Sequence, residues 1–492
     1  MQTFDTSQLF FILPELILLS GVSFILILNL FLNKSSQLLG YYLSQALLII
    51  TIIASFYLVG EDVKIFSNSF VVDNLATTLK IVMLIFSLIL MQYTKEYLIK
   101  KDLFKNEYFS LILLSIFGMM IMASGSNLIT LYLGLEIMSL TLYSLIAMAN
   151  TRILAIEASL KYFILGAIAS GILLYGMSLL YGITGSLDIA TISANVVDAN
   201  PLIVNFSIVF IVIGIAFKFG AVPFHMWVPD VYQGSNMATT MFLSSIPKIA
   251  TAIMFIRILV EGLGSSVEYW SSIVLFLGVF SVAVGTLVAL VQTNIKRLLA
   301  YSTIAHIGFI LVAFSIGSKD GYSAAIYYTI IYVFTTIAAF GILIALGQNK
   351  SHNSNIINKA GTTETTDTTM ISSFSGISKT NPMLAFLMLI VMLSMAGVPP
   401  IIGFYAKLAV LLEVVNSGQF AVAGVLMVLA VIGAYYYLKI IKVMYFDDNK
   451  NDQRGVVKNS FLMNLFLLLN VFALVVLGIF PDYFTDLIYQ LF

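Results

Sequence analysis

Long apolar runs separated by short polar connections make up most of the 492-residue chain. A helix needs about 20 predominantly apolar residues to cross the roughly 30 Å hydrocarbon core of a bilayer. Runs of this length predict fourteen membrane-spanning helices, and hence an all-α polytopic membrane protein. The expected spans are residues 9–32, 38–58, 73–92, 108–123, 127–149, 160–183, 202–220, 239–262, 270–292, 298–317, 323–347, 383–414, 419–446 and 459–480.

Glycine and proline interrupt two of these spans at matching places. The seventh span ends in FKFGAVPFHMWVPDVYQGS (Phe217–Ser235), and the twelfth contains AGVPPIIGFYAKL (Ala396–Leu408). Interrupted spans in corresponding positions of two halves are typical of a transport site built from discontinuous helices. The two interruptions lie five helices apart, and five is an odd number. Spans 4–8 and 9–13 are therefore expected to form two five-helix repeats of inverted orientation, with helices 7 and 12 discontinuous.

These repeats divide the chain into four parts. Residues 1–107 are expected to form an N-terminal three-helix segment, residues 108–262 the first five-helix unit, residues 263–446 the second, and residues 447–492 a C-terminal helix. The polar segment 348–381 contains GTTETTDTT and SSFSGIS. Because such a composition cannot bury a core, it predicts a flexible cytoplasmic loop.

Basic residues are distributed unequally between alternate loops, and cytoplasmic loops are expected to hold most of them. The other set of loops holds only Lys64 and Lys319. This bias does not change sides along the chain, which supports the span count and places both termini on the non-cytoplasmic side. The basic set is Lys34, Lys95, Lys100, Lys101, Lys105, Arg152, Lys296, Arg297, Lys350, Lys359, Lys379, Lys450, Arg454 and Lys458.

Composition excludes several classes of protein. Hydrophobic residues make up 60% of the chain and charged residues 10%, so a soluble core of this length is excluded and the lipid bilayer is the solvent. The absence of cysteine excludes disulfides, thiolate zinc sites and cysteine-bound iron–sulfur clusters. The 24 basic and 24 acidic residues balance, and no basic block of the kind that binds nucleic acid is present. We expect no cofactor and no metal in this chain.

Ionisable residues inside the expected spans are the main candidates for function. A charged side chain at the bilayer centre costs roughly 2.5–3.5 kcal/mol on insertion scales, so it is interpreted as functional by default. Glu136 lies in the fifth span, about 13 Å deep at 1.5 Å per residue. Lys218 precedes the break in the seventh span, Lys248 lies inside the eighth, His306 inside the tenth, and Lys407 just after the break in the twelfth.

Structural interpretations of the same residues stay open. Lys218 and Lys407 could extend to an interface along their aliphatic stems. Glu136 and Lys248 could form an ion pair that only holds neighbouring helices together, and His306 could be a hydrogen-bonded structural histidine. Four further charges lie nearer span ends: Lys80, Glu157, Lys161 and Arg257. For these residues extension to the interface is the favoured interpretation, and Lys161 is the first candidate for an exception.

Buried lysines beside one glutamate suit proton transport. Burial disfavours the charged form of a lysine and a nearby carboxylate favours it, so movement of Glu136 relative to Lys218 would switch whether that lysine holds a proton. Moving one charge across 100 mV requires about 2.3 kcal/mol, so an energy source must be coupled to the chain. The sequence contains no phosphate-binding glycine loop and no soluble domain that could supply it. The chain is therefore expected to be one part of a larger complex.

Nearly the whole chain resembles the antiporter-like membrane subunits of proton-pumping NADH–quinone oxidoreductase (respiratory complex I). The motif VPFHMWVPD is similar across that wider family, which includes the multisubunit cation/proton antiporters. The DVYQG that follows resembles the subunit N family, the counterpart of mitochondrial subunit 2. The segments that carry the resemblance are the Glu136 helix, Glu157–Leu187, Phe217–Ser235, Ile295–Phe309 and Met392–Leu408.

The resemblance implies specific roles. Glu136 would be the modulating carboxylate, Lys218 and Lys248 the central proton carriers, Lys407 the terminal carrier of the second half-channel, and His306 a relay. His225 is expected to be a structural or entrance group.

The resemblance also implies partners and a location. The implied partners are neighbouring antiporter-like and small membrane subunits, with FMN, iron–sulfur clusters and quinone bound in other subunits of the complex. The implied location is a bacterial inner membrane. Two alternatives remain open: a subunit of a sodium/proton antiporter, and a structural module whose charges only hold the bundle together.

Overall fold

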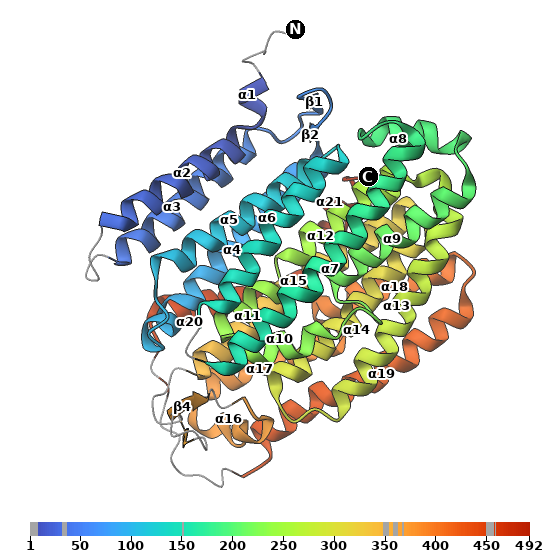
Figure 1. Cartoon of the computed structure of the whole chain (residues 1–492). Helices are drawn as coiled ribbons and strands as arrows, with labels where there is room; N and C mark the ends of the chain where they lie inside the picture. Colours follow the sequence, from blue (N-terminus) through green and yellow to red (C-terminus); the bar gives the residue numbers. More distant parts are fainter. Residues whose placement is uncertain are drawn as a thin grey trace.

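The computed structural model describes residues 8–31, 37–149, 152–347, 354–357, 363–366, 369–448, 457 and 459–492. Most of its long helices run side by side in one bundle, with the pair α2 (Leu13–Phe31) and α3 (Gln37–Phe56) along one edge (Figure 1). Thirteen helices of the described residues are long and apolar enough to cross a membrane, which confirms the all-α membrane fold.

The remaining elements follow in chain order. They are α1 (Gln8–Phe11), β1 (Val63–Ile65), β2 (Phe70–Val72), α4 (Asn74–Lys100), α5 (Asn106–Ser124), α6 (Leu128–Ala147), α7 (Ile153–Thr184), α8 (Ile189–Asn195), η2 (Val196–Asp198), α9 (Pro201–Phe219), α10 (Trp227–Gly234), α11 (Met237–Ser244), α12 (Pro247–Phe255), η3 (Ile256–Gly262), η4 (Gly264–Ser266), α13 (Val267–Leu290), α14 (Ile295–Ser315), α15 (Lys319–Leu346), β3 (Ser354–Ile357), β4 (Thr363–Thr366), η6 (Ile371–Phe374), α16 (Ile377–Thr380), α17 (Pro382–Ala396), α18 (Ile402–Asn416), α19 (Phe420–Tyr445), α20 (Phe461–Ile479) and α21 (Pro481–Tyr489). β1 pairs antiparallel with β2, and β3 pairs antiparallel with β4.

The predicted breaks in the seventh and twelfth spans are both present. α9 ends at Gly220 with φ 80°, and α17 ends at Gly397 with φ 82°, a left-handed conformation that glycine adopts without steric cost. α17 and α18 have 15 residues each. At 1.5 Å per residue each half is about 22 Å long, too short to cross the bilayer alone. Together the two halves form the predicted twelfth span.

The eighth span has a break that the hydropathy pattern did not predict. The expected continuous helix over 239–262 is divided into α11, α12 and the π-helical segment η3. Ser245 separates α11 from α12 with φ −115° and ψ −92°. The physical reason is Pro247, which has no N–H to continue the hydrogen bonds of α11 and is tolerated at the first turn of α12.

Small residues hold equivalent helix pairs together in the two expected repeats. A Cβ on Gly118 of α5 would lie 2.7 Å from the Gly134 carbonyl oxygen of α6. A Cβ on Gly278 of α13 would lie 3.0 Å from the Gly308 carbonyl oxygen of α14. Without a hydrophobic driving force in lipid, such close backbone contact is how membrane helices associate. The fourth and fifth spans therefore pack in the same way as the ninth and tenth.

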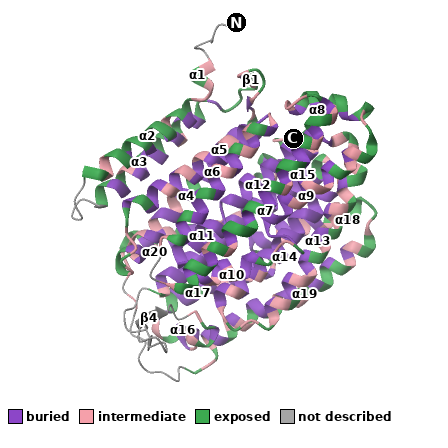
Figure 2. Cartoon of the chain, viewed as in Figure 1, coloured by how far each residue is buried: buried purple, intermediate pink, exposed green. Residues whose placement is uncertain are grey.

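Burial follows membrane topology (Figure 2). α14 and α15 lie at the centre and are buried over nearly their whole length, whereas α2, α3 and α19 expose many apolar side chains. A soluble protein would not expose so many apolar residues, but lipid or a neighbouring subunit can cover them.

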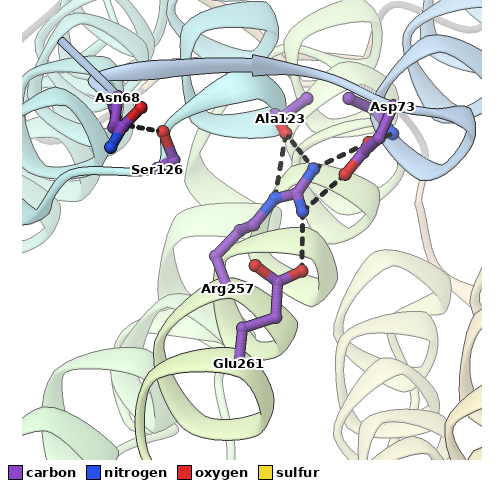
Figure 3. A network of polar contacts seen from close by, with 7 residues as sticks. Asn68, Asp73, Ala123, Ser126, Arg257 and Glu261 are labelled. Atoms are coloured by element: carbon purple, nitrogen blue, oxygen red, sulfur yellow. Dashed lines mark hydrogen bonds and ion pairs between the residues drawn. The ribbon is translucent and has the colours of Figure 1, made fainter. Parts of the chain in front are cut away.

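Two charges near span ends do not extend to an interface as expected. Lys80 of α4 is 3% exposed and forms a 2.5 Å ion pair with Glu15 of α2, which is 1% exposed. Arg257 of η3 is 2% exposed and contacts Asp73 and Glu261 at 2.8 and 2.6 Å (Figure 3). That interpretation was therefore wrong for Lys80 and Arg257, because each is buried with a carboxylate partner that compensates for lost hydration.

Arg257 also connects three parts of the chain. Its Nη2 donates to Asp73 Oδ1 at 2.9 Å and to the Ala123 carbonyl at 3.2 Å (Figure 3). Asp73 in turn caps α4 by accepting a hydrogen bond from the Ala76 N–H at 2.8 Å. Burial raises the pKa of the Asp73 carboxyl, but Arg257 outweighs burial and lowers it below its ordinary value. The N-terminal helices are thereby fixed to the end of the eighth span.

The polar loop is only partly as expected. Residues 369–381 are ordered against α19, and Ile371, Phe374 and Ile377 are buried there. The prediction of a flexible loop without a core was therefore wrong for this part, because three apolar side chains spaced three residues apart share one face. Much of residues 348–368 lies outside the described residues, as do these predicted cytoplasmic charges: Lys34, Lys350, Lys359, Lys450, Arg454 and Lys458.

The Lys80–Glu15 pair gives a stability prediction. Lys80→Met leaves Glu15 buried without a counter-charge and should lower the free energy of unfolding by about 3–5 kcal/mol. The double variant Glu15→Gln, Lys80→Met removes both charges and should recover most of that loss. The measurement is the thermal unfolding midpoint in detergent. Equal loss in the single and double variants would show that the ion pair is not what Lys80 contributes.

Candidate functional site

The break after α9 places the first predicted lysine inside the bundle. Lys218 lies in the last turn of α9 and is 5% exposed. Its Nζ donates a 2.7 Å hydrogen bond to Ser139 Oγ on α6. Glu136 lies on the same helix, three residues before Ser139 and so on a neighbouring part of its surface. Glu136 is only partly buried, and its Oε1 is a buried atom that no described residue hydrogen-bonds.

The second predicted lysine closes the end of α9. Lys248, 1% exposed, donates from Nζ to the carbonyl oxygens of Lys218 at 3.0 Å and Phe219 at 2.9 Å. These carbonyls belong to the last turn of α9, where no further N–H is available from the helix. A cation at this end also interacts favourably with the helix dipole. Lys248 and Lys218 therefore share one site.

Aromatic and hydroxyl groups complete the same break. Trp227 Nε1 donates to the Phe217 carbonyl at 3.0 Å, and the Lys248 ammonium lies 5.3 Å from the centroid of the Trp227 ring. The N–H of Val222, within the turn, donates to Ser281 Oγ of α13 at 2.9 Å. Backbone that leaves a helix inside a membrane must find such partners within the protein.

The break in the eighth span is closed by a tyrosine. The Tyr332 hydroxyl of α15 donates to the Ser244 carbonyl at the end of α11, at 2.8 Å. The same hydroxyl lies 2.9 Å from Thr303 Oγ1 of α14. Lys248 follows four residues after Ser244, so this contact joins the lysine-bearing break to the helix that carries His306.

His306 lies between two tyrosine hydroxyls. The imidazole is 8% exposed, with Nδ1 2.8 Å from the Tyr328 hydroxyl of α15 and Nε2 3.0 Å from the Tyr437 hydroxyl of α19. Tyr437 also hydrogen-bonds Ser302 Oγ. Every nitrogen of the ring therefore has a hydroxyl partner.

The twelfth span repeats the lysine cap of the seventh. Lys407 of α18 is 9% exposed, and its Nζ donates to the Met395 and Ala396 carbonyls at the end of α17, both at 2.9 Å. The same ammonium lies 6.0 Å from the centroid of the Phe309 ring, one turn after His306 on α14. Both breaks predicted from the sequence thus end on a buried ammonium.

A charged cavity opens beside α10. Asp230 accepts hydrogen bonds from Lys161 of α7 and Arg297 of α14, both at 2.9 Å, and Lys161 also pairs with Glu157 at 2.7 Å. The cavity between them has a volume of about 200 Å³. Burial alone raises the pKa of the Asp230 carboxyl, but the hydrogen bonds from Lys161 and Arg297 outweigh burial and hold it below its ordinary value.

His225 lies apart from the lysines. It is half-buried in the turn before α10, and burial lowers the pKa of its imidazole below the ordinary value. Among the described residues, no group of three or more histidine, aspartate or glutamate side chains is arranged to hold a metal ion.

The structure brings the five predicted site residues into two groups with a link between them. Glu136, Lys218 and Lys248 surround the α9 break, and His306 lies near Lys407 in the second half. Sequence reasoning missed the linking hydroxyls, which are carried by Ser139, Tyr332, Tyr328, Tyr437, Ser302 and Thr303. Their signal was tyrosine in the middle of a span, because membrane tyrosines are otherwise enriched at the interfaces.

Comparison with known proteins agrees with this geometry. Residues 125–433 match the model of the NADH:quinone oxidoreductase/Mrp antiporter transmembrane family. NADH-quinone oxidoreductase subunit N of Ruthia magnifica is 49% identical, over 99% of each chain. The subunit N of Hydrogenovibrio crunogenus is 43% identical, over 97% of each chain.

Solved structures share the fold. A chain of respiratory complex I from Thermus thermophilus with bound aureothin has a TM-score of 0.80 and 26% identity, covering 96% of this chain and 98% of that one. A chain of the Mrp complex from Dietzia has a TM-score of 0.83 at 19% identity, covering 99% and 97%, a likeness of fold alone.

The two lysine-capped breaks and the helical bundle define a membrane subunit of the antiporter-like class, as the matching family model does. Within that class, identity of 49% over nearly the full length is decisive. The chain belongs to the NADH-quinone oxidoreductase subunit N family.

The Lys407 cap can be tested through one glycine. A Cβ at Gly397 would lie 2.9 Å from Lys407 Cδ, so Gly397→Ala must displace that side chain. Gly418 has nearly the same φ, 80°, with open space around it, so Gly418→Ala is a matched control for backbone strain. Both variants should lose roughly 1–2 kcal/mol of stability to strain. Gly397→Ala should lose about 2–3 kcal/mol more, because charge-assisted hydrogen bonds are broken.

The measurement is thermal unfolding of both variants in detergent, repeated in a Lys407→Met background. With no ammonium to displace, the difference between the two glycine variants should largely disappear. A difference that persists unchanged without Lys407 would show that Gly397 acts through something other than the cap.

Proposed function

We propose that this chain is a proton-translocating membrane subunit of an NADH–quinone oxidoreductase. In this proposal, quinone reduction elsewhere in the complex drives protons through the buried residues of this chain. The observation that carries it is the pair of helix breaks, each closed by a buried lysine that donates to the helix end. NADH, FMN, iron–sulfur clusters and quinone belong to other subunits, and the membrane partners are neighbouring antiporter-like and small subunits.

The site residues take distinct roles in this proposal. Lys218 and Lys248 are the central carriers. Glu136 modulates the charge of Lys218 from α6, the helix whose Ser139 accepts the hydrogen bond from Lys218. A charged Lys218 costs free energy when buried, and an ionised Glu136 reduces that cost. His306 relays protons, and Lys407 is the terminal carrier of the second half. The hydrogen bonds of Lys218 to Ser139 and of Tyr332 to Ser244 and Thr303 support continuity between these groups.

Breaks inside the membrane support a hydrated path beside the lysines. Irregular backbone at membrane depth is tolerated where protein covers it or where it lines a wet cavity. Buried polar atoms without a protein partner, such as Glu136 Oε1, are the groups that ordered water satisfies. A proton could pass along such water between an ammonium and a neutral amine. This gives the lysines a function beyond closing helix ends.

We further propose a bacterial inner-membrane location with both termini on the non-cytoplasmic side. α1 and the C-terminus lie toward the same end of the bundle, and α16 lies at the opposite end (Figure 1). The loops on the α16 side carry the excess of lysine and arginine that marks a cytoplasmic face. The matched glycine pairs and helix breaks likewise support units over residues 108–262 and 263–446, between an N-terminal segment 1–107 and a C-terminal part 447–492.

The first test removes the carriers in the assembled complex. Lys218→Met and Glu136→Gln should each lower NADH-driven proton pumping by about a hundredfold, the lower end of the effects of lost proton-transfer groups. Lys64→Met, at an exposed lysine of strand β1, is the matched control. The measurements are proton uptake into inverted membrane vesicles and the amount of assembled complex. Normal pumping by fully assembled Lys218→Met would contradict the role of this lysine.

A second measurement separates the antiporter alternative. The same vesicles, without NADH, are given a sodium gradient, and proton movement is followed. The proposal predicts no sodium-driven proton movement that depends on Lys218. Sodium-driven exchange without an electron donor, lost in Lys218→Met, would favour the sodium/proton antiporter instead.

A further inference from the structure

Both ring nitrogens of His306 face tyrosine hydroxyls, one from α15 and one from α19. A hydroxyl can donate or accept a hydrogen bond, so each tyrosine can exchange roles with the ring nitrogen that it contacts. A neutral imidazole has one N–H donor and one acceptor nitrogen. One tyrosine must therefore accept from the ring while the other donates to it. Exchanging these two roles moves a proton from one side of the ring to the other.

The groups on either side extend this arrangement in two directions. The Tyr437 hydroxyl continues to Ser302 Oγ. The Tyr328 ring stacks on Phe309 with centroids 5.8 Å apart, and Phe309 lies beneath the Lys407 ammonium. Tyr332, with its ring centroid 5.4 Å from that of His306, reaches the α11–α12 break that precedes Lys248. His306 and its tyrosines thus lie between the two lysine-capped breaks.

We propose that Tyr328 and Tyr437 are proton-relay residues, which hold His306 between two hydroxyls so that a proton crosses the ring by tautomer exchange. The proposal rests on the proposed function and names the groups that would carry a proton past His306. It requires no charged imidazole, which would be costly at a buried site where its hydrogen-bond partners are neutral hydroxyls.

The proton balance of one passage is as follows. The Tyr328 hydroxyl gives its proton to Nδ1 while the Nε2 proton passes to the Tyr437 oxygen. Tyr437 gives its former hydroxyl proton to Ser302 Oγ, and Ser302 releases its own proton to a water molecule. The Tyr328 oxygen regains a proton from a donor on the Lys407 side, the ammonium itself or water protonated by it. One proton enters and one leaves, and rotation of the hydroxyls together with a half-turn of the imidazole ring resets the chain.

The test compares tyrosines that differ in hydrogen bonding. Tyr437→Phe and Tyr328→Phe remove one relay hydroxyl each and keep the ring. Tyr327→Phe is the matched control, because Tyr327 is fully buried on the same helix as Tyr328 and its hydroxyl hydrogen-bonds no described residue. Ser302→Ala, which leaves all rings in place, serves as a second variant if a tyrosine variant fails to assemble.

The measurements are NADH-driven proton pumping by assembled complex and its ratio in H₂O and D₂O. Relay variants should pump about a hundredfold more slowly, the lower end of what loss of a positioned proton-transfer group causes. Their deuterium isotope effect should rise, because the interrupted transfer becomes rate-limiting. Tyr327→Phe should match wild type in both, and a purely structural role would not raise the isotope effect.

The outcomes separate this inference from the proposed function. If Lys218→Met is impaired but Tyr437→Phe, Tyr328→Phe and Ser302→Ala all behave like Tyr327→Phe, the relay is overturned and the proposed function stands. If Lys218→Met pumps normally, the proposed function fails first, and the relay fails with it.

Discussion

A helix that ends inside a membrane leaves carbonyl groups without partners, and this constraint organises the structure. In water those groups would be hydrated, but in hydrocarbon each unsatisfied group costs several kcal/mol. The chain meets the cost with hydrogen-bond donors from neighbouring helices. Lys248 supplies them at the end of α9, Tyr332 at the end of α11, and Lys407 at the end of α17. The same contacts bring ionisable groups to the breaks.

Buried charges away from the helix breaks are stabilised in a different way. Lys80 with Glu15, and Arg257 with Asp73, are compensated by direct ion pairs. The first pair joins α2 to α4, and the second joins the start of α4 to η3. Lys218, Lys248 and Lys407 instead contact hydroxyl or carbonyl oxygens, which are neutral. An ammonium held by neutral groups can lose its proton without leaving a carboxylate uncompensated. The type of partner therefore separates lysines suited to exchange protons from those suited to hold helices together.

The sequence indicated the spans, both glycine-proline breaks and five ionisable residues inside the spans, because hydropathy, helix-breaking residues and isolated charges are local signals. Pairing between distant segments is not a local signal. Nothing near Lys80 indicates that Glu15, on another helix, compensates it. Pro247 indicated the break in the eighth span, but the apolar residues around it gave the hydropathy pattern of one continuous helix. The hydroxyl contacts of His306 depend on where α15 and α19 pack, which no single stretch specifies.

Both halves of the chain close a helix break with a buried lysine, but the two lysines come from different positions relative to the break. Lys407 follows Gly397 by ten residues, and Asp230 follows Gly220 by the same number. Equivalent positions after the two breaks thus hold a base in one half and an acid in the other. In the first half the cap comes from the next span, as Lys248, and Asp230 instead pairs with Lys161 and Arg297 beside an open cavity. Similar breaks in the two halves therefore coexist with unlike charges at equivalent positions after them.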